Sequence, residues 1–120
     1  MPTKTRTYYK NHFRDLIEKT GNKNQTIIIT STSFDRAKTG IAVYKNGKLN
    51  YLESPKYKVQ SKVSGSGDIT AAMFLSYILK GHNLSTALKN VTTCLDGIFM
   101  TTHNLDTDEL ALIQAQKFIK

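Results

Sequence analysis

The stretch Ser64-Gly65-Ser66-Gly67-Asp68 is the part of the sequence best suited to chemistry. Two glycines at alternate positions let the backbone approach a ligand closely, and a helix that begins here offers unpaired N–H groups and the positive end of its dipole to an anion. A carboxylate beside such a site repels a phosphate, so Asp68 calls for a chemical role. The structural alternative is that Asp68 serves only as the helix N-cap. No Gly-Lys-Ser/Thr follows, which excludes a Walker-type phosphate loop.

A helix from Asp68 to about Lys80 is expected to hold this turn. Its sequence is apolar almost all round, a composition typical of a central, buried helix. Gly81 is expected to end it. A second, amphipathic helix should follow, because apolar residues recur there at helical spacing. Its expected inner face is Leu84, Ala87, Leu88, Val91 and Leu95.

The residues before the turn predict a short sheet. Residues 26–30 form a β-branched run, Thr-Ile-Ile-Ile-Thr, which indicates a buried strand parallel to its neighbours. Residues 40–45 and 48–53 are strand-like, and Asn46-Gly47 lies between them. This dipeptide tolerates the positive φ angles of a tight turn, so the two runs are predicted to form a β-hairpin.

Helices are expected at both ends of the chain. Helical spacing of apolar residues predicts an amphipathic helix over residues 8–20. A last helix is expected to begin near Asp106, with Glu109 completing a capping box and Leu105 meeting Leu110 as a hydrophobic staple. Together these elements predict one α/β domain over residues 1–120, in which helices pack on a short sheet that contains a β-hairpin.

Cysteine and histidine usage argues against a structural metal or a disulfide framework. Cys94 is the single cysteine, and the three histidines do not have metal-ligand spacing. Cys94 lies in a predicted amphipathic helix, where it is expected to be a small buried residue. No apolar run approaches the roughly 18 to 20 residues of a membrane span, and residues 1–10 lack the apolar core of a secretory signal. We therefore expect a cytoplasmic protein that does not contact a membrane.

The positive charge is concentrated in the first half of the chain. The net charge is +8, and residues 1–62 hold 13 Lys/Arg against 4 Asp/Glu, whereas residues 63–120 hold 4 against 5. A basic half can attract nucleic acid, a membrane surface or a polyphosphate ligand, or it can be a solvated face. The sequence has no zinc-finger spacing and no Arg-rich cluster interleaved with aromatic residues. We therefore do not expect nucleic acid as a partner.

The stretch from Val63 to Val91 resembles the second signature of the ribokinase superfamily, in which a Gly-x-Gly-Asp turn opens a central helix. The segments IIITSTS, SGSGD, ITAAMFLSYIL and ALKNVTTCLDGIFMTTHN resemble more specifically those of pyridoxal kinases. This resemblance implies ATP and Mg²⁺ as cofactors and the hydroxymethyl group of a B6 vitamer as the phosphate acceptor. It extends over roughly residues 8–118, but it is tight only from Val63 to Asn104.

The resemblance also implies roles for individual residues. The backbone amides of Gly65, Ser66 and Gly67 would form an anion hole for the transferred phosphoryl group, with Asp68 as the catalytic base. Thr30 and Ser31 would lie beside the ATP phosphates, and Ser66 would also bind the nucleotide. Three further residues would border the nucleotide: Val59, Gln60 and Ser61.

Ribokinase-type kinases are considerably longer than this chain. The resemblance therefore implies the C-terminal, nucleotide-binding part of a kinase, without the N-terminal half that grips the acceptor and surrounds the magnesium. Such a part is expected to be inactive alone. The alternatives are a non-catalytic nucleotide-binding remnant and another kinase of the superfamily, acting on hydroxymethylpyrimidine or a sugar. A homodimer is an assembly that the sequence allows.

Overall fold

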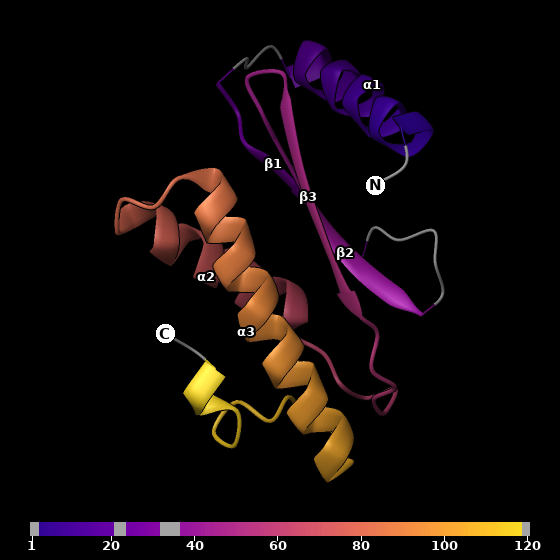
Figure 1. Ribbon diagram of the computed structural model, residues 1–120, viewed down its shortest axis with the longest axis vertical. Helices are drawn as coiled ribbons and strands as arrows, with labels where there is room; N and C mark the ends of the chain where they lie inside the picture. Colours follow the sequence, from indigo (N-terminus) through magenta and orange to yellow (C-terminus); the bar gives the residue numbers. More distant parts are fainter. Residues whose placement is uncertain (1–2, 21–23, 32–36, 119–120) are drawn as a thin grey trace.

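The computed structural model describes residues 3–20, 24–31 and 37–118. A three-stranded antiparallel sheet of order β1-β2-β3 lies between one helix on one face and two helices on the other (Figure 1). The elements in chain order are α1 (Thr3–Thr20), β1 (Ile27–Ile29), β2 (Lys38–Lys45), β3 (Lys48–Pro55), α2 (Ser66–Leu79), α3 (Leu84–Leu105) and the short 3₁₀ helix η1 (Gln116–Phe118). These layers confirm the predicted fold class, an α/β arrangement in which helices pack on a sheet that contains a hairpin.

The hairpin follows from its two-residue turn. Asn46 and Gly47 have φ angles of 52° and 78°, which these residue types accept readily. Lys45 therefore pairs with Lys48, and the register continues to Lys38 opposite Pro55. The predicted hairpin is confirmed, and both strands begin or end two residues beyond the predicted bounds.

Alternation along β2 divides the core into two clusters. Ile41 and Val43 face α2 and α3, whereas Ala42 and Tyr44 face α1. On the α1 side, the ring of Phe13 lies 5.3 Å from that of Tyr44, between ring centroids. The central strand is thus buried on both faces, and each helix layer contributes one side of the core.

The expected parallel strand is antiparallel instead. Ile27–Ile29 pairs with β2 in the register Ile27 to Tyr44, and its residues are half-buried. Only residues 30–37 connect the two strands, whereas a parallel pairing needs a crossover of a dozen residues or more.

The expected last helix does not form. Asp106 ends α3 in a left-handed conformation with φ 50°, and the segment after it consists of turns up to η1. Tertiary contacts replace the predicted capping box. The Gln60 side chain donates to the Asp106 backbone carbonyl at 2.6 Å, and the Ala111 N–H donates to the Thr102 hydroxyl at 3.0 Å.

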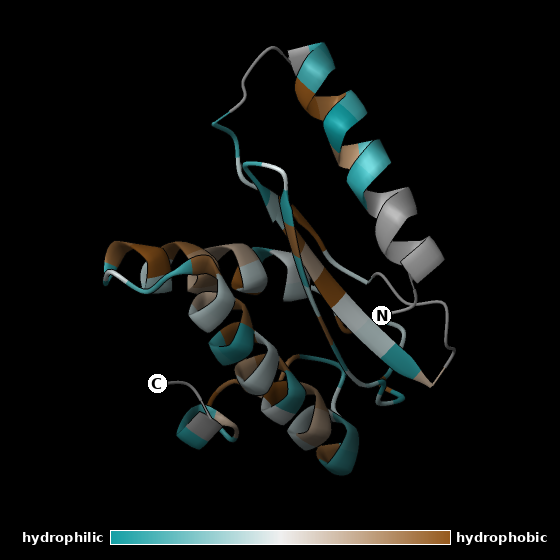
Figure 2. Ribbon diagram, turned by 45° about the horizontal axis from the view of Figure 1, so that its top comes forward, coloured by the Kyte–Doolittle hydropathy of each residue, from teal (hydrophilic) through white to brown (hydrophobic). Residues whose placement is uncertain are grey.

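The helix α2 is buried on one face only. Thr70, Phe74 and Tyr77 are buried against the sheet and α3, but Leu75 and Leu79 are 59% and 76% exposed. The all-round apolar sequence predicted full burial, whereas only one face of the helix is buried in the described chain. Figure 2 shows the strongly hydrophobic colouring of its C-terminal turns. Among the described helices, none combines the length and apolar character needed to cross a bilayer.

Candidate functional site

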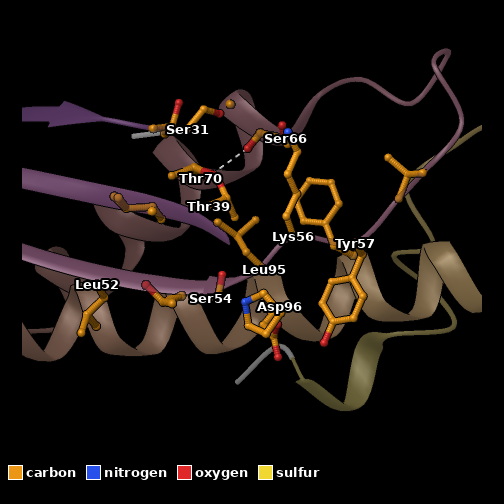
Figure 3. A pocket seen from close by; sticks show the side chains of 18 residues that line it. Ser31, Thr39, Leu52, Ser54, Lys56, Tyr57, Ser66, Thr70, Leu95 and Asp96 are labelled. Atoms are coloured by element: carbon orange, nitrogen blue, oxygen red, sulfur yellow. Dashed lines mark hydrogen bonds between the residues drawn. The ribbon is translucent and has the colours of Figure 1, made fainter. Parts of the chain in front are cut away.

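A pocket of about 200 Å³ lies where the sheet, α2, α3 and the linker between β3 and α2 meet (Figure 3). Its lining is contributed by the end of β1, the open ends of β2 and β3, the first turn of α2 and the middle of α3. The layered fold therefore creates the pocket at its junctions, and no single element contains it.

The first turn of α2 is open toward this pocket. Gly65 precedes the helix with φ 91°, a left-handed conformation that favours glycine, and no side chain caps the helix. The first backbone bond of the turn runs from the Ile69 N–H to the Gly65 carbonyl, at 3.1 Å. The N–H groups of Ser66, Gly67 and Asp68 come earlier and have no intrahelical acceptor. Ser66 and Gly67 line the pocket, so this turn offers donors to an anion there.

Asp68 is the third residue of α2 and is exposed. The helix begins two residues earlier than expected, and Gly65 holds the N-cap position. The alternative in which Asp68 serves as the N-cap is therefore wrong. The negative charge of Asp68 still interacts favourably with the positive, N-terminal end of the helix dipole. The role of catalytic base stays a prediction for Asp68.

Thr30 and Ser31 follow β1 directly and line the pocket, on the side facing the start of α2. Ser31 has a φ of 57°. A serine in the left-handed region is strained by about 1 kcal/mol or more, and such strain concentrates at ligand sites. Both residues line the same pocket as the start of α2, and their place beside the ATP phosphates stays a prediction.

The remaining predicted positions lie in the linker after β3, and only one of them lines the pocket. Val59 lines the pocket, whereas Gln60 and Ser61 lie outside its lining. Gln60 instead donates from Nε2 to the backbone carbonyl and to Oδ1 of Asp106, at 2.6 and 3.2 Å. His103 Nδ1 lies 2.5 Å from the Lys58 carbonyl, which can only accept. We name these contacts the linker clasp, and they give Gln60 a structural role.

Four polar residues of the pocket carry no sequence signal. Lys56 and Tyr57 come from the linker, and Thr92 and Asp96 lie one turn apart on α3. Thr92 Oγ1 and Asp96 Oδ1 are buried without a hydrogen-bond partner among the described residues. Buried polar atoms ordinarily have partners, so these two mark a place where a ligand or water can supply one. They belong to an otherwise ordinary amphipathic helix, and only their position in the fold reveals them.

Burial raises the pKa of the Tyr57 phenol above its usual value of 10, and the charge and hydrogen bond of the Asp96 carboxylate raise it further. The phenol is therefore neutral at physiological pH and can act as a hydrogen-bond donor.

Sequence comparison finds similarity to curated kinases. The chain is 28% identical over 74 residues to the pyridoxal kinase PdxY of Histophilus somni, and 31% identical over 61 residues to that of Corynebacterium diphtheriae. Over part of its length, this chain is similar to the pyridoxal kinases. These matches cover 62% and 51% of the chain but only 26% and 22% of the pyridoxal kinases. No protein-family model matches the chain.

Solved structures show the same fold over nearly the whole chain. Two crystal forms of a protein described as a phosphomethylpyrimidine kinase from Bacteroides thetaiotaomicron superpose with TM-scores of 0.77 and 0.69, at 20% and 24% identity. The second form contains pyridoxal. The superpositions cover 91% and 93% of this chain but only 38% and 40% of that kinase. The fold is that of part of a ribokinase-type kinase, as the pyridoxal kinase resemblance implied.

Proposed function

We propose that this chain is the nucleotide-binding part of an ATP-dependent kinase that phosphorylates the hydroxymethyl group of pyridoxal or a related B6 vitamer. The observation that carries the proposal is the open first turn of α2, where unpaired N–H groups and Asp68 share one turn at a pocket. The similarity to pyridoxal kinases supports the choice of acceptor.

The proposed chemistry divides one turn between two tasks. The acceptor hydroxyl oxygen forms a bond to the γ-phosphorus of ATP, the bond to the bridging oxygen breaks, and ADP leaves. Asp68 takes the hydroxyl proton, for which the oxygen must lie within about 3 Å of the carboxylate. The amides of Gly65, Ser66 and Gly67 would stabilise the negative charge on the transferred group, because fixed N–H donors need no reorganisation during the reaction.

The pocket fits one portion of a nucleotide. Its volume of about 200 Å³ is below the roughly 300–1,000 Å³ of complete small-molecule sites. The phosphates would lie between Ser31 and the start of α2, within reach of the Lys56 side chain. The unpartnered oxygens of Thr92 and Asp96 suit the hydrogen-bond donors of a nucleoside. For this incomplete site we expect ATP affinity in the millimolar range, about −4 kcal/mol.

Magnesium enters the proposal with the nucleotide. Mg²⁺ in kinases is commonly held by phosphates together with one or two carboxylates. Within the described part of the chain, no three His, Cys, Asp or Glu side chains come together as a metal site. We therefore assign no residue of this chain to the metal, whose protein ligands would belong to the rest of a kinase.

Two other functions remain as candidates. A non-catalytic nucleotide-binding module is favoured by the exposure of Asp68, which lies at the surface of the described chain. A kinase acting on hydroxymethylpyrimidine or a sugar would share the fold, as the Bacteroides structures illustrate for a protein described as a phosphomethylpyrimidine kinase. Turnover with each acceptor distinguishes these functions.

The test uses the chain alone and a chimera in which it replaces the superposed portion of the Bacteroides kinase. ADP release is measured with ATP, Mg²⁺ and either pyridoxal or hydroxymethylpyrimidine. We expect no turnover by the chain alone and turnover of pyridoxal by the chimera. Asp68→Asn in the chimera should lower kcat by about 10²–10⁴-fold, the usual range for a general base, with ATP affinity within a few-fold. An Asp68→Asn chimera that retains full turnover would exclude Asp68 as the base.

A further inference from the structure

Two side chains of α3 present orphaned oxygen atoms at the pocket. Thr92 Oγ1 and Asp96 Oδ1 are buried, and within residues 3–20, 24–31 and 37–118 no group bonds to either atom. The two residues are four positions apart, which places them one above the other on the same helix face. The Tyr57 phenol hydrogen-bonds to the Asp96 carboxylate, and Oδ1 is the oxygen left over. We call Thr92 Oγ1 and Asp96 Oδ1 the α3 oxygen pair.

The pocket has opposite electrostatic preferences on its two sides. The first turn of α2 offers N–H donors and the positive end of a helix dipole, which favour an anion. Figure 3 shows Asp96 on the α3 side of the pocket, opposite Ser31 and Ser66. The carboxylate of Asp96 repels a phosphate and needs hydrogen-bond donors instead. A ligand of this pocket is therefore expected to be anionic at one end and to carry neutral donors at the other.

A sugar meets this requirement better than a nucleobase. The pocket volume of about 200 Å³ is below that of a complete small-molecule site, so the pocket suits the part of a nucleotide next to its phosphates, which is the ribose. Side chains at i and i+4 have Cβ atoms about 5–6 Å apart, a span that two neighbouring hydroxyls bridge with bonds of about 2.7 Å. An acidic side chain holds the ribose 2′-hydroxyl in dinucleotide-binding folds for the same chemical reason.

We propose that Thr92 and Asp96 bind the 2′- and 3′-hydroxyls of the nucleotide ribose, so that this face of α3 selects a ribonucleotide. The inference rests on the proposed function, because it assigns one further part of the nucleotide whose phosphates the start of α2 would hold. Both side chains are half-buried as a whole, so rotation about χ1 can turn the α3 oxygen pair into the pocket when a ligand binds. The new bonds end the unpaired state of two buried oxygens.

NMR titrations of the isolated chain measure this selectivity. ATP, 2′-deoxy-ATP, 3′-deoxy-ATP and GTP are each added to the wild type and to Asp96→Ala. In the wild type, GTP should bind within about threefold of ATP, and each deoxy nucleotide should bind about tenfold more weakly, the usual effect of one hydrogen bond to a charged group. In Asp96→Ala, ATP and the deoxy nucleotides should bind with similar, weaker affinity.

Thr92→Val adds a readout that a merely structural threonine would not give. Valine keeps the branched shape of threonine and removes only the orphaned oxygen. The unfolding midpoint of the free chain should therefore rise by about 2 °C or more, while ATP affinity falls. Thr93→Val is the matched control, because Thr93 lies outside the pocket lining and its hydroxyl donates to the Lys89 carbonyl at 3.0 Å. The control should not raise the midpoint and should leave ATP affinity unchanged.

The contrary outcomes separate this inference from the proposed function. Equal binding of ATP and both deoxy nucleotides by the wild type would overturn the inference and leave nucleotide binding standing. Rejection of GTP, together with acceptance of the deoxy nucleotides, would place the base at α3 and overturn the inference as well. A lower midpoint for Thr92→Val would show that its hydroxyl is already paired in the free chain, which also contradicts the inference. A wild-type chain that binds none of these nucleotides would remove the proposed function together with the inference.

Discussion

The two long helices that follow the sheet begin in opposite ways. At the start of α3, the Asn83 side chain accepts a hydrogen bond from the Thr86 N–H at 2.8 Å, with an extended backbone at Asn83. At the start of α2, Gly65 has φ 91° and no side chain accepts from the first turn. The first turn of α3 has a side-chain acceptor for one of its N–H donors, whereas the first turn of α2 has none and lies beside a pocket. The contrast teaches that a missing side-chain cap can indicate a ligand site, because the same chain does cap α3 with an asparagine.

The largest expected effect comes from two glycines with the same backbone conformation. Gly65 and Gly81 have φ angles of 91° and 92°, and a Cβ at either position would meet nothing within 4 Å. Alanine at either site should therefore lower the free energy of unfolding by about 1–2 kcal/mol through backbone strain alone. Urea denaturation measures this loss. Only Gly65→Ala should also weaken ATP binding in calorimetry, and equal ATP affinities for the two variants would remove the distinction between a site glycine and a helix-ending glycine.

The cap of α3 should behave as a purely structural feature. Asn83→Ala removes the acceptor for the Thr86 N–H and should lower the free energy of unfolding by about 1 kcal/mol. Asn83→Ser keeps a capping oxygen and should recover most of that loss. ATP affinity should be the same in both variants and in the wild type. A changed affinity would show that the two helix starts are coupled.

The smallest expected effect concerns the pH dependence of the pocket wall. Because the pKa of Tyr57 is raised above 10 in the folded chain, the protonated phenol stabilises the fold below pH 10, and this contribution is lost as pH rises through the folded-state pKa. Absorbance titration near 295 nm, taken as wild type minus Tyr57→Phe, should show a midpoint above pH 10. The stability difference between the two proteins should be constant from pH 7 to 9. A midpoint at or below 10 would show a solvated phenol.

Local signals predicted the elements that depend on local chemistry. Asn46-Gly47 is sufficient for the hairpin because two positive φ angles decide the turn, and Gly81 ends α2 for the same reason. The last helix failed because its signal was equally local but a distant residue competed with it. Asp106 ends α3 and accepts from Gln60, which is 46 positions away. A capping-box pattern contains no information about such a distant partner. In the same way, a run of β-branched residues predicts a strand but not whether β1 pairs in the parallel or the antiparallel direction.

The candidate site was predictable only where a motif marks it. The pocket brings together five of the predicted positions: Thr30, Ser31, Val59, Ser66 and Gly67. The other four lie outside its lining: Gln60, Ser61, Gly65 and Asp68. Their roles in binding and catalysis stay predictions. Lys56 and the residues of α3 that line the pocket were missed, because a helix face toward a ligand has the same spacing as a helix face toward a core.

The linker clasp has a consequence for how the chain can be divided. Gln60 and His103 tie the linker to the end of α3, so hydrogen bonds close residues 60–106 into a loop. The exposed connection between α2 and α3 lies within this loop, at Gly81-His82-Asn83. A cut between His82 and Asn83 would leave the Asn83 cap with α3, while the clasp and the core shared by α2 and α3 hold the fragments together. The fold therefore contains an exposed split point, at which we expect a chain in two pieces to reassemble.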